Sequence, residues 1–235
     1  MQEIPLPNLA LSFLPVAVVV AILYRWSLGG GMAIYAMARM LIQLLLIGYV
    51  LNFIFQTEHS LVIVGVLTVM LIAASWIALR TTTNQKRGAN LFKVLCAIVL
   101  GGVTTLILVT QGVLDLDPWF EPKKMIPLAG MIFAGAMNAV SLAGERFDAE
   151  MAQHGEYLQA RRTALGAALI PITNSLFAVG LVSLPGMMTG QILSGVSPLI
   201  AARYQIMVMC MLFGSSGISA ACYLAWIRPK EVVVN

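Results

Sequence analysis

Charged residues are scarce in this chain. Of its 235 residues only 10% are Asp, Glu, Lys or Arg, whereas 60% are hydrophobic and the mean hydropathy is +0.90. A soluble domain carries roughly 25% charged residues, because these keep its surface in water. The composition excludes an ordinary soluble domain. It predicts an all-α, polytopic membrane protein whose surface faces membrane lipid.

Several sequence motifs of enzymes and nucleotide-binding proteins are also missing. The sequence holds no GxxxxGK[ST] motif, which argues against a P-loop for ATP, and no HExxH motif of a zinc protease. It has no Ser/Lys pair placed for intramembrane proteolysis. Basic residues are not interleaved with aromatic ones, so we expect no nucleic-acid partner. We therefore expect a protein that is not an enzyme and has no ATPase site of its own.

Long apolar runs are what the chain has instead. About 20 residues are needed to cross the hydrocarbon core, and seven runs reach that length. Between the runs lie glycine clusters, prolines or charged residues. The sequence thus predicts about seven transmembrane helices in a single domain over residues 1–235. They are expected near residues 7–25, 32–55, 60–80, 91–111, 125–143, 164–184 and 200–227.

The basic residues give this topology a direction. Ten of the fourteen Lys and Arg residues fall on one side of it: Arg25, Arg80, Lys86, Arg87, Lys93, Arg146, Arg161, Arg162, Arg228 and Lys230. The opposite side holds Glu3, Glu58, Asp115, Asp117 and Glu121, with Lys123 and Lys124. Cytoplasmic loops are enriched in Lys and Arg. We therefore expect the N-terminus outside and the C-terminus in the cytoplasm.

Two segments differ from plain spans. In the cytoplasmic connector 144–163, residues 148–162 are expected to form a helix with Met151 and Leu158 on one face, although a solvated connector is equally consistent. Segment 184–198 is uncharged but rich in Gly and Pro. Irregular backbone at membrane depth survives only under protein or beside water. A re-entrant element is therefore predicted there, with a simple outer loop as the alternative.

Few polar residues lie within the predicted spans. All ten acidic residues lie outside them. That counts against a secondary transporter, which usually carries its coupling carboxylate within the membrane. Arg39 and Gln43 are four residues apart and share a helix face. They line a pathway, or Arg39 snorkels to the interface. Asn138 and Asn174 are further pathway candidates, with hydrogen bonding between helices as the alternative.

Sulfur is more plentiful than charge within the membrane. The fourteen methionines include Met187 and Met188, which we count among the pathway candidates. Thioethers suit soft ions such as Cu(I), but Met also serves as adaptable packing. The three cysteines, Cys96, Cys210 and Cys222, fall in apolar runs and are expected to be reduced. No metal ligand set can be assigned from the sequence.

Five runs together resemble the Fet-type permeases. They are RMLIQLLLIGYVL (39–51), MIPLAGMI (125–132), ALIPITNS (168–175), VGLVSLPGMMTGQILSGVSP (179–198) and YQIMVM (204–209). These permeases are the membrane subunits of a small group of ABC transporters implicated in bacterial iron export. Plant relatives act in aluminium tolerance. The similarity covers nearly the whole chain, from Arg39 to about Trp226.

The resemblance implies an ABC transporter permease in the bacterial inner membrane that exports a metal ion, iron by analogy. ATP and Mg would bind a separate cytoplasmic ATPase, so this chain needs no cofactor, and a second copy of the permease would complete a homodimer. The connector 144–163 would couple to the ATPase through Met151, Glu156, Leu158, Arg161 and Arg162. Two alternatives remain: a secondary transporter, and a non-transporting receptor or scaffold.

Overall fold

The computed structural model describes residues 4–57, 59–80 and 87–227. Its regular elements are all helices, and the described residues include no strand, which confirms the all-α prediction. The chain divides into two compact units, Met1–Thr57 and Glu58–Asn235, hereafter unit 1 and unit 2. Each unit is described by itself.

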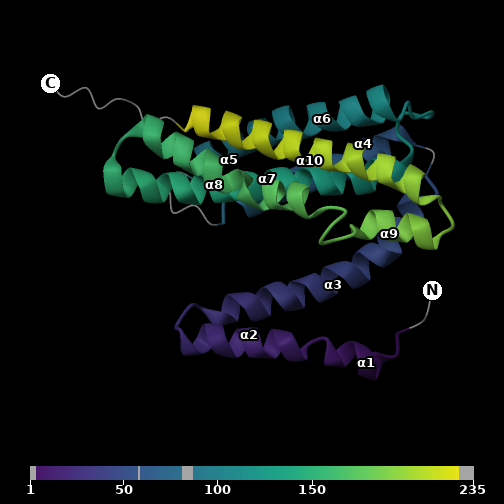
Figure 1. Ribbon diagram of the computed structural model, residues 1–235, viewed down its shortest axis with the longest axis horizontal. Helices are drawn as coiled ribbons and strands as arrows, with labels where there is room; N and C mark the ends of the chain where they lie inside the picture. Colours follow the sequence, from purple (N-terminus) through teal and green to yellow (C-terminus); the bar gives the residue numbers. More distant parts are fainter. Residues whose placement is uncertain (1–3, 58, 81–86, 228–235) are drawn as a thin grey trace. The chain divides into compact units, whose positions relative to one another are not determined.

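Unit 1 is a helical hairpin (Figure 1). Its helices are α1 (Leu6–Leu11), α2 (Leu14–Arg25) and α3 (Gly30–Ile54). The turn before α3 requires glycine at two positions. Gly29 has a φ of 73°, and a Cβ on Gly30 would lie 2.7 Å from the ring of Tyr24. A left-handed residue and a contact this close both favour Gly.

Unit 2 is a bundle of long antiparallel helices (Figure 1). Its last helix, α10, packs against α7, α8, α9 and the α5–η1 segment, while α4 packs against α5 and α7. The elements are α4 (Ser60–Ala78), α5 (Arg87–Ile98), η1 (Val99–Val103), α6 (Thr104–Ile107), η2 (Leu108–Val113), α7 (Pro122–His154), α8 (Tyr157–Ala178), α9 (Gly186–Leu193) and α10 (Pro198–Trp226).

Small residues bring the helices of unit 2 close together. A Cβ on Gly101 of η1 would lie 2.7 Å from the backbone nitrogen of Ser219 and 2.9 Å from the carbonyl oxygen of Ser215. Where α7, α8 and α10 meet, a buried cluster contains Ala143, Ala164 and further alanines. Lipid gives no hydrophobic drive to helix pairing, so close van der Waals packing must hold such a bundle together.

Six helical segments among the described residues are long and apolar enough to cross a membrane. They are Leu6–Arg25, Gly30–Ile54, Ser60–Ala78, Asn90–Val113, Pro122–Gln153 and Pro198–Trp226. These six match six of the predicted spans. The seventh, 164–184, falls mostly on α8, which is 22 residues long but carries Arg161, Arg162 and Asn174. The count of seven and the orientation of the termini thus stay predictions.

The predicted separate helix over residues 148–162 is wrong. Helix α7 continues to His154, Gly155 ends it with a φ of 68°, and α8 begins at Tyr157. At 1.5 Å per residue the 33 residues of α7 measure about 50 Å, which exceeds the hydrocarbon core of about 30 Å. The connector is therefore the tip of a helical hairpin, with one sharp turn at a left-handed glycine.

The segment 184–198 contains a helix shorter than any span. Helix α9 has eight residues, with Pro185 before it and Pro198 opening α10. Proline is suited to the first turn of a helix, so the two prolines mark where α9 and α10 begin. The predicted break in the backbone is present, whereas the re-entrant position remains a prediction.

Candidate functional site

A groove between α7, α8 and α10 collects uncharged polar side chains within unit 2. Asn138 of α7, Ser175 of α8 and Ser216 of α10 line it, together with Met131 and Pro171. Its volume of about 290 Å³ has room for on the order of ten water molecules at about 30 Å³ each. We call it the polar groove.

A proline interrupts the backbone hydrogen bonding of α8 beside this groove. Pro171 lies inside α8 and has no N–H, so the carbonyl of Ala167 lacks its usual helical donor. Four residues on, the Ser175 hydroxyl donates to the Pro171 carbonyl oxygen at 3.0 Å. The groove thus has amide and hydroxyl oxygens on its wall, beside a point where α8 lacks one backbone hydrogen bond.

The chemistry of the groove suits weak rather than tight binding of a cation. No charged residue is among the described residues that line it, and most of its surface is apolar. Neutral oxygens can replace part of the hydration shell of a hard cation or hold a hydrated one, but they do not neutralise its charge. Such a site suits a step along a path better than permanent storage.

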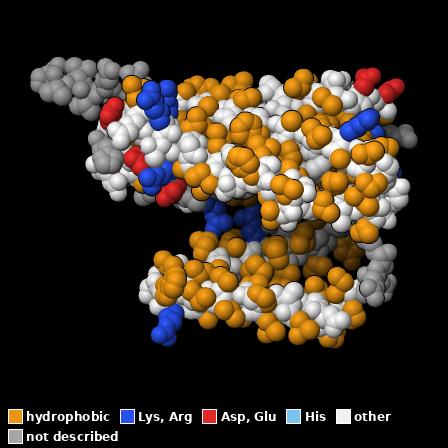
Figure 2. Space-filling model, in the orientation of Figure 1, with side chains coloured by type: hydrophobic (Ala, Val, Ile, Leu, Met, Phe, Trp, Pro, Cys, Tyr) orange, Lys and Arg blue, Asp and Glu red, His pale blue; other side chains and the backbone are white. Residues whose placement is uncertain are grey.

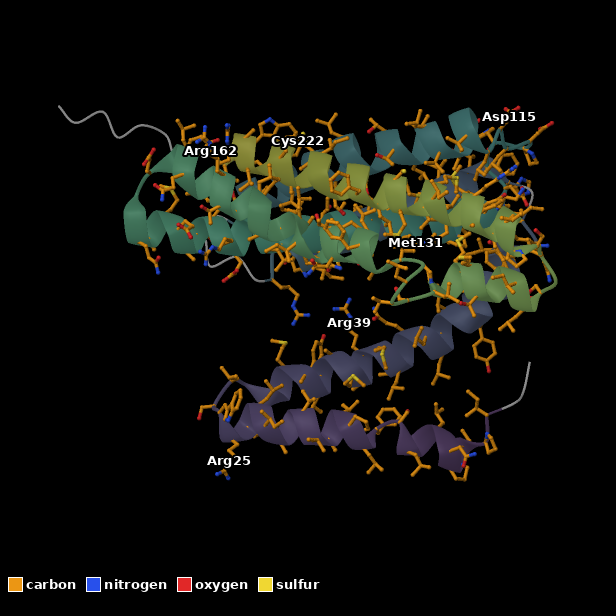
Figure 3. The ribbon with its side chains drawn as sticks, viewed as in Figure 1. Arg25, Arg39, Asp115, Met131, Arg162 and Cys222 are labelled. Carbon is orange, nitrogen blue, oxygen red and sulfur yellow. The ribbon has the colours of Figure 1, made fainter. Side chains whose placement is uncertain are left out.

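The predicted pathway residues fall in different parts of the molecule. Asn138 and Asn174 are both exposed, but only Asn138 is among the residues that line the polar groove. Arg39 and Gln43 lie on α3 of unit 1, with Arg39 partway along the helix (Figure 3). Helix α3 is continuous there, so their predicted shared face is present. Their pathway role stays a prediction.

The neighbouring methionines Met187 and Met188 line two different cavities. Met187 lines a cavity of about 340 Å³ with Lys123, Lys124 and Tyr204. Met188 lines one of about 360 Å³ with Met209 and Cys210, which we call the sulfur groove. Adjacent residues on a helix point about 100° apart, which is how the two side chains come to line different cavities, and their pathway role stays a prediction. The described residues hold no group of three or more His, Cys, Asp or Glu side chains that could bind a metal.

The tip of the α7–α8 hairpin is held rigidly in place. The Tyr157 hydroxyl donates to the Leu224 carbonyl oxygen at 3.0 Å, and its ring meets Phe147 edge-on at 6.0 Å. The Arg161 guanidinium lies 5.7 Å above the same ring. Met151 packs against the buried alanine cluster nearby. These contacts join the tip of α7 and α8 to the end of α10.

The predicted coupling residues divide between the interior and the surface of this tip. Met151 packs inward, whereas Leu158 is 54% exposed and Glu156 and Arg162 are exposed. The predicted common face of Met151 and Leu158 is therefore wrong, because the turn at Gly155 places them on different helices. Arg146 forms an ion pair with buried Glu150 on the last turns of α7.

Charge lies at the ends of unit 2 and apolar surface between them. Figure 2 shows hydrophobic side chains over most of the visible face of this unit, with charged side chains at both ends. Arg162 and Asp115 occupy opposite ends (Figure 3). The Lys124 ammonium and Glu121 carboxylate pair at 2.8 Å near the Asp115 end. This distribution suits a bundle that crosses a membrane.

Sequence reasoning missed two of the polar residues that matter here. Ser175 and Ser216 complete the polar groove. Two signals could have found them. Pro171 within a predicted helix, with Ser175 four residues later, indicates an interrupted backbone. The run GSSGIS (214–219), rich in small residues, indicates a close contact between helices.

Comparison with known proteins places the chain in one family. The model of "Uncharacterised protein family (UPF0014)" matches residues 6–230. The chain is 35% identical to "Probable iron export permease protein FetB" of Escherichia coli (strain K12), with 93% of this chain and 90% of that protein covered. It is also 35% identical to "Protein ALUMINUM SENSITIVE 3" of Arabidopsis thaliana, with 94% and 85% covered.

A third relative, "UPF0014 membrane protein slr1647" of Synechocystis, is 35% identical over 84% of this chain and 82% of its own length. No solved structure matches the chain. The resemblance to Fet-type permeases is confirmed, and six apolar helices together with relatives named as membrane proteins indicate a multi-pass membrane protein. The chain belongs to the UPF0014 family of membrane proteins.

Proposed function

We propose that this chain is the membrane-spanning permease subunit of an ABC transporter that exports a metal ion, iron in the first instance. The observation that carries the proposal is the polar groove, an uncharged groove on an apolar bundle with Asn138, Ser175 and Ser216 along its wall. The chain is 35% identical to a protein named as a probable iron export permease, and this similarity supports iron as the substrate.

The pathway runs through the polar groove. The side chains of Asn138, Ser175 and Ser216 exchange with water around the passing ion. With neutral ligands only, the ion is held weakly and can leave again. Energy must then come from outside the membrane domain, which is consistent with ATP and Mg on a separate subunit.

The hairpin tip is where that energy enters. A rigid tip that protrudes beyond the hydrocarbon core, with Glu156, Leu158 and Arg162 exposed, suits a groove on a cytoplasmic ATPase. Motion of the ATPase would move α7 and α8 together, because Tyr157 ties them to α10. These two helices and α10 enclose the polar groove.

The proposal also includes the topology and the assembly. Helix α8 serves as the seventh span beside α7 and α10, its two arginines at the cytoplasmic interface. The N-terminus is outside and the C-terminus in the cytoplasm, by the bias of basic residues. Two copies of the permease pair with two ATPase subunits in the bacterial inner membrane.

Reconstitution tests the function directly. The permease and a candidate ABC ATPase subunit are placed together in liposomes, and iron movement is followed with ATP, without ATP, and with an imposed proton or sodium gradient. We expect movement only with ATP. Asn138→Ala should lower the rate by at least about tenfold, because a positioned polar contact of about 1.4 kcal/mol is lost from the pathway.

Asn174→Ala is the matched control, since this asparagine is one residue from the groove but does not line it. It should lower the rate by less than about threefold, within the range of a surface change. Equal effects of the two substitutions on the rate would show that the groove is not part of the transport pathway. Movement that follows an ion gradient without ATP would identify a secondary transporter, and no movement at all would favour a receptor or scaffold.

A further inference from the structure

The sulfur groove lies apart from the polar groove and brings together ligands from two helices. Met188 comes from α9, while Met209 and Cys210 come from α10, and α9 packs against α10. The cavity has a volume of about 360 Å³. It shares no described lining residue with the polar groove, so it is a separate site.

A buried amide oxygen independently indicates a missing partner in this groove. Gln205 also lines it, four residues before Met209 and hence on the same face of α10. Its side chain is only 6% exposed, and its Oε1 atom is buried with no hydrogen-bond partner. An unpaired buried polar atom costs about 1–3 kcal/mol unless something satisfies it.

The set of donors around Gln205 is chemically selective. Thioether and thiolate sulfur favour Cu(I) over hard ions such as Mg²⁺ or Ca²⁺. In blue-copper sites, whose strong ligands are two His and one Cys, a glutamine oxygen can serve as the long, weak axial ligand. Met209 is buried, whereas Cys210 is exposed at the surface of α10.

We infer that the sulfur groove binds a soft monovalent metal ion, Cu(I), through the sulfur atoms of Met188, Met209 and Cys210, with Gln205 Oε1 as a weak fourth ligand. On binding, the Cys210 thiol releases its proton to water and the new Cu–S bond replaces the S–H bond. The copper remains Cu(I) throughout, so no oxidant or reductant is consumed. The site functions without the ATPase and without the polar groove.

Copper titration of the full-length purified protein in lipid nanodiscs tests the inference. Under anaerobic conditions Cu(I) is titrated against a chromogenic chelator, and X-ray absorption reports the atoms bound to copper. We expect one Cu(I) per chain with sulfur neighbours. Because loss of an outer partner alone costs about 10–100-fold in metal affinity, Cys210→Ser should cost at least about 100-fold.

Met209→Leu should weaken binding similarly while preserving the fold, since Leu and Met have nearly the same volume. The matched controls are Met187→Leu, which changes the adjacent methionine in another cavity, and Cys222→Ser, which changes a cysteine outside the groove. Both should bind Cu(I) like the unaltered protein. No Cu(I) binding, unaltered affinity in Cys210→Ser and Met209→Leu, or equal losses in the controls would each overturn the inference.

Discussion

Single side chains decide how the helices of unit 2 approach one another. Gly101 faces the backbone of α10 at Ser215 and Ser219. Gly135 of α7 faces Ser216, and a Cβ on Gly135 would lie 3.2 Å from the Ser216 hydroxyl oxygen. The same serines lie on the face of α10 that borders η1 and the polar groove. Helix packing and the lining of the polar groove therefore depend on neighbouring residues of one short run.

Gly101→Ala should destabilise the protein although alanine is the better helix former. The added methyl would meet backbone atoms of α10 at 2.7 and 2.9 Å, which cannot yield without a shift of the helix. Overpacking of this kind costs about 1–3 kcal/mol. The melting temperature of the detergent-solubilised protein measures the loss.

Gly65→Ala is the matched control for this change, because a methyl group at position 65 meets nothing within 4 Å. This exposed helical position should be unchanged or stabilised by up to about 1 kcal/mol. A Gly101→Ala protein that melts at or above the unaltered temperature would show that η1 and α10 are not packed as described.

At the scale of elements, two adjacent arginines at the tip of the α7–α8 hairpin, Arg161 and Arg162, have different roles. Arg161 lies over the Tyr157 ring and belongs to the packing of the tip. Arg162 is exposed at the same end of unit 2 (Figure 3). Only the second is free to meet a partner without disturbing the contacts that hold the tip.

Arg162→Glu should therefore weaken capture of the ATPase by at least about tenfold through reversed charge at a docking surface. Its melting temperature should stay within about 2 °C of the unaltered protein, as expected of a surface substitution. Co-purification of the two subunits measures the first effect and thermal unfolding the second.

The matched control is Lys123→Glu, the same charge reversal at the opposite end of the bundle. Its ATPase capture should equal that of the unaltered protein. If both reversals reduced capture alike, net charge rather than the tip would govern the association.

At the scale of the whole molecule, the number of crossings depends on α8. Its 22 residues lie beside α7 and α10, yet its composition keeps it outside the six apolar spans. Alanines at positions 160, 164 and 168 are buried against its neighbours. A helix covered by protein on one side needs less apolar surface than one surrounded by lipid.

Cysteine labelling from outside the cell checks the topology. In a protein with its three native cysteines replaced by serine, Asp115→Cys and Ser194→Cys should react with a membrane-impermeant maleimide. Gln153→Cys at the hairpin tip should react only after permeabilisation. If Ser194→Cys instead required permeabilisation, α8 would not cross the membrane and the chain would have six spans.

The fold class could be read from the sequence because burial in lipid demands long apolar runs wherever a helix crosses. Six of the seven predicted spans have counterparts among the apolar helices, and Asn138 was identified because a polar residue inside such a run is conspicuous. The hairpin tip was predicted incorrectly. The charged residues around 148–162 indicated a separate helix, while a single left-handed glycine decided that α7 and α8 meet at one turn.

The sequence by itself determined that this is an all-helical membrane protein and that its family is that of the Fet-type permeases. Both follow from patterns local to the chain, namely hydropathy, charge bias and distinctive runs. Only the tertiary structure decided that Asn138 meets Ser175 and Ser216, and that Met187 and Met188 belong to different cavities. Those groupings join residues from separate helices, and the helix packing that creates them depends on contacts between side chains far apart in sequence.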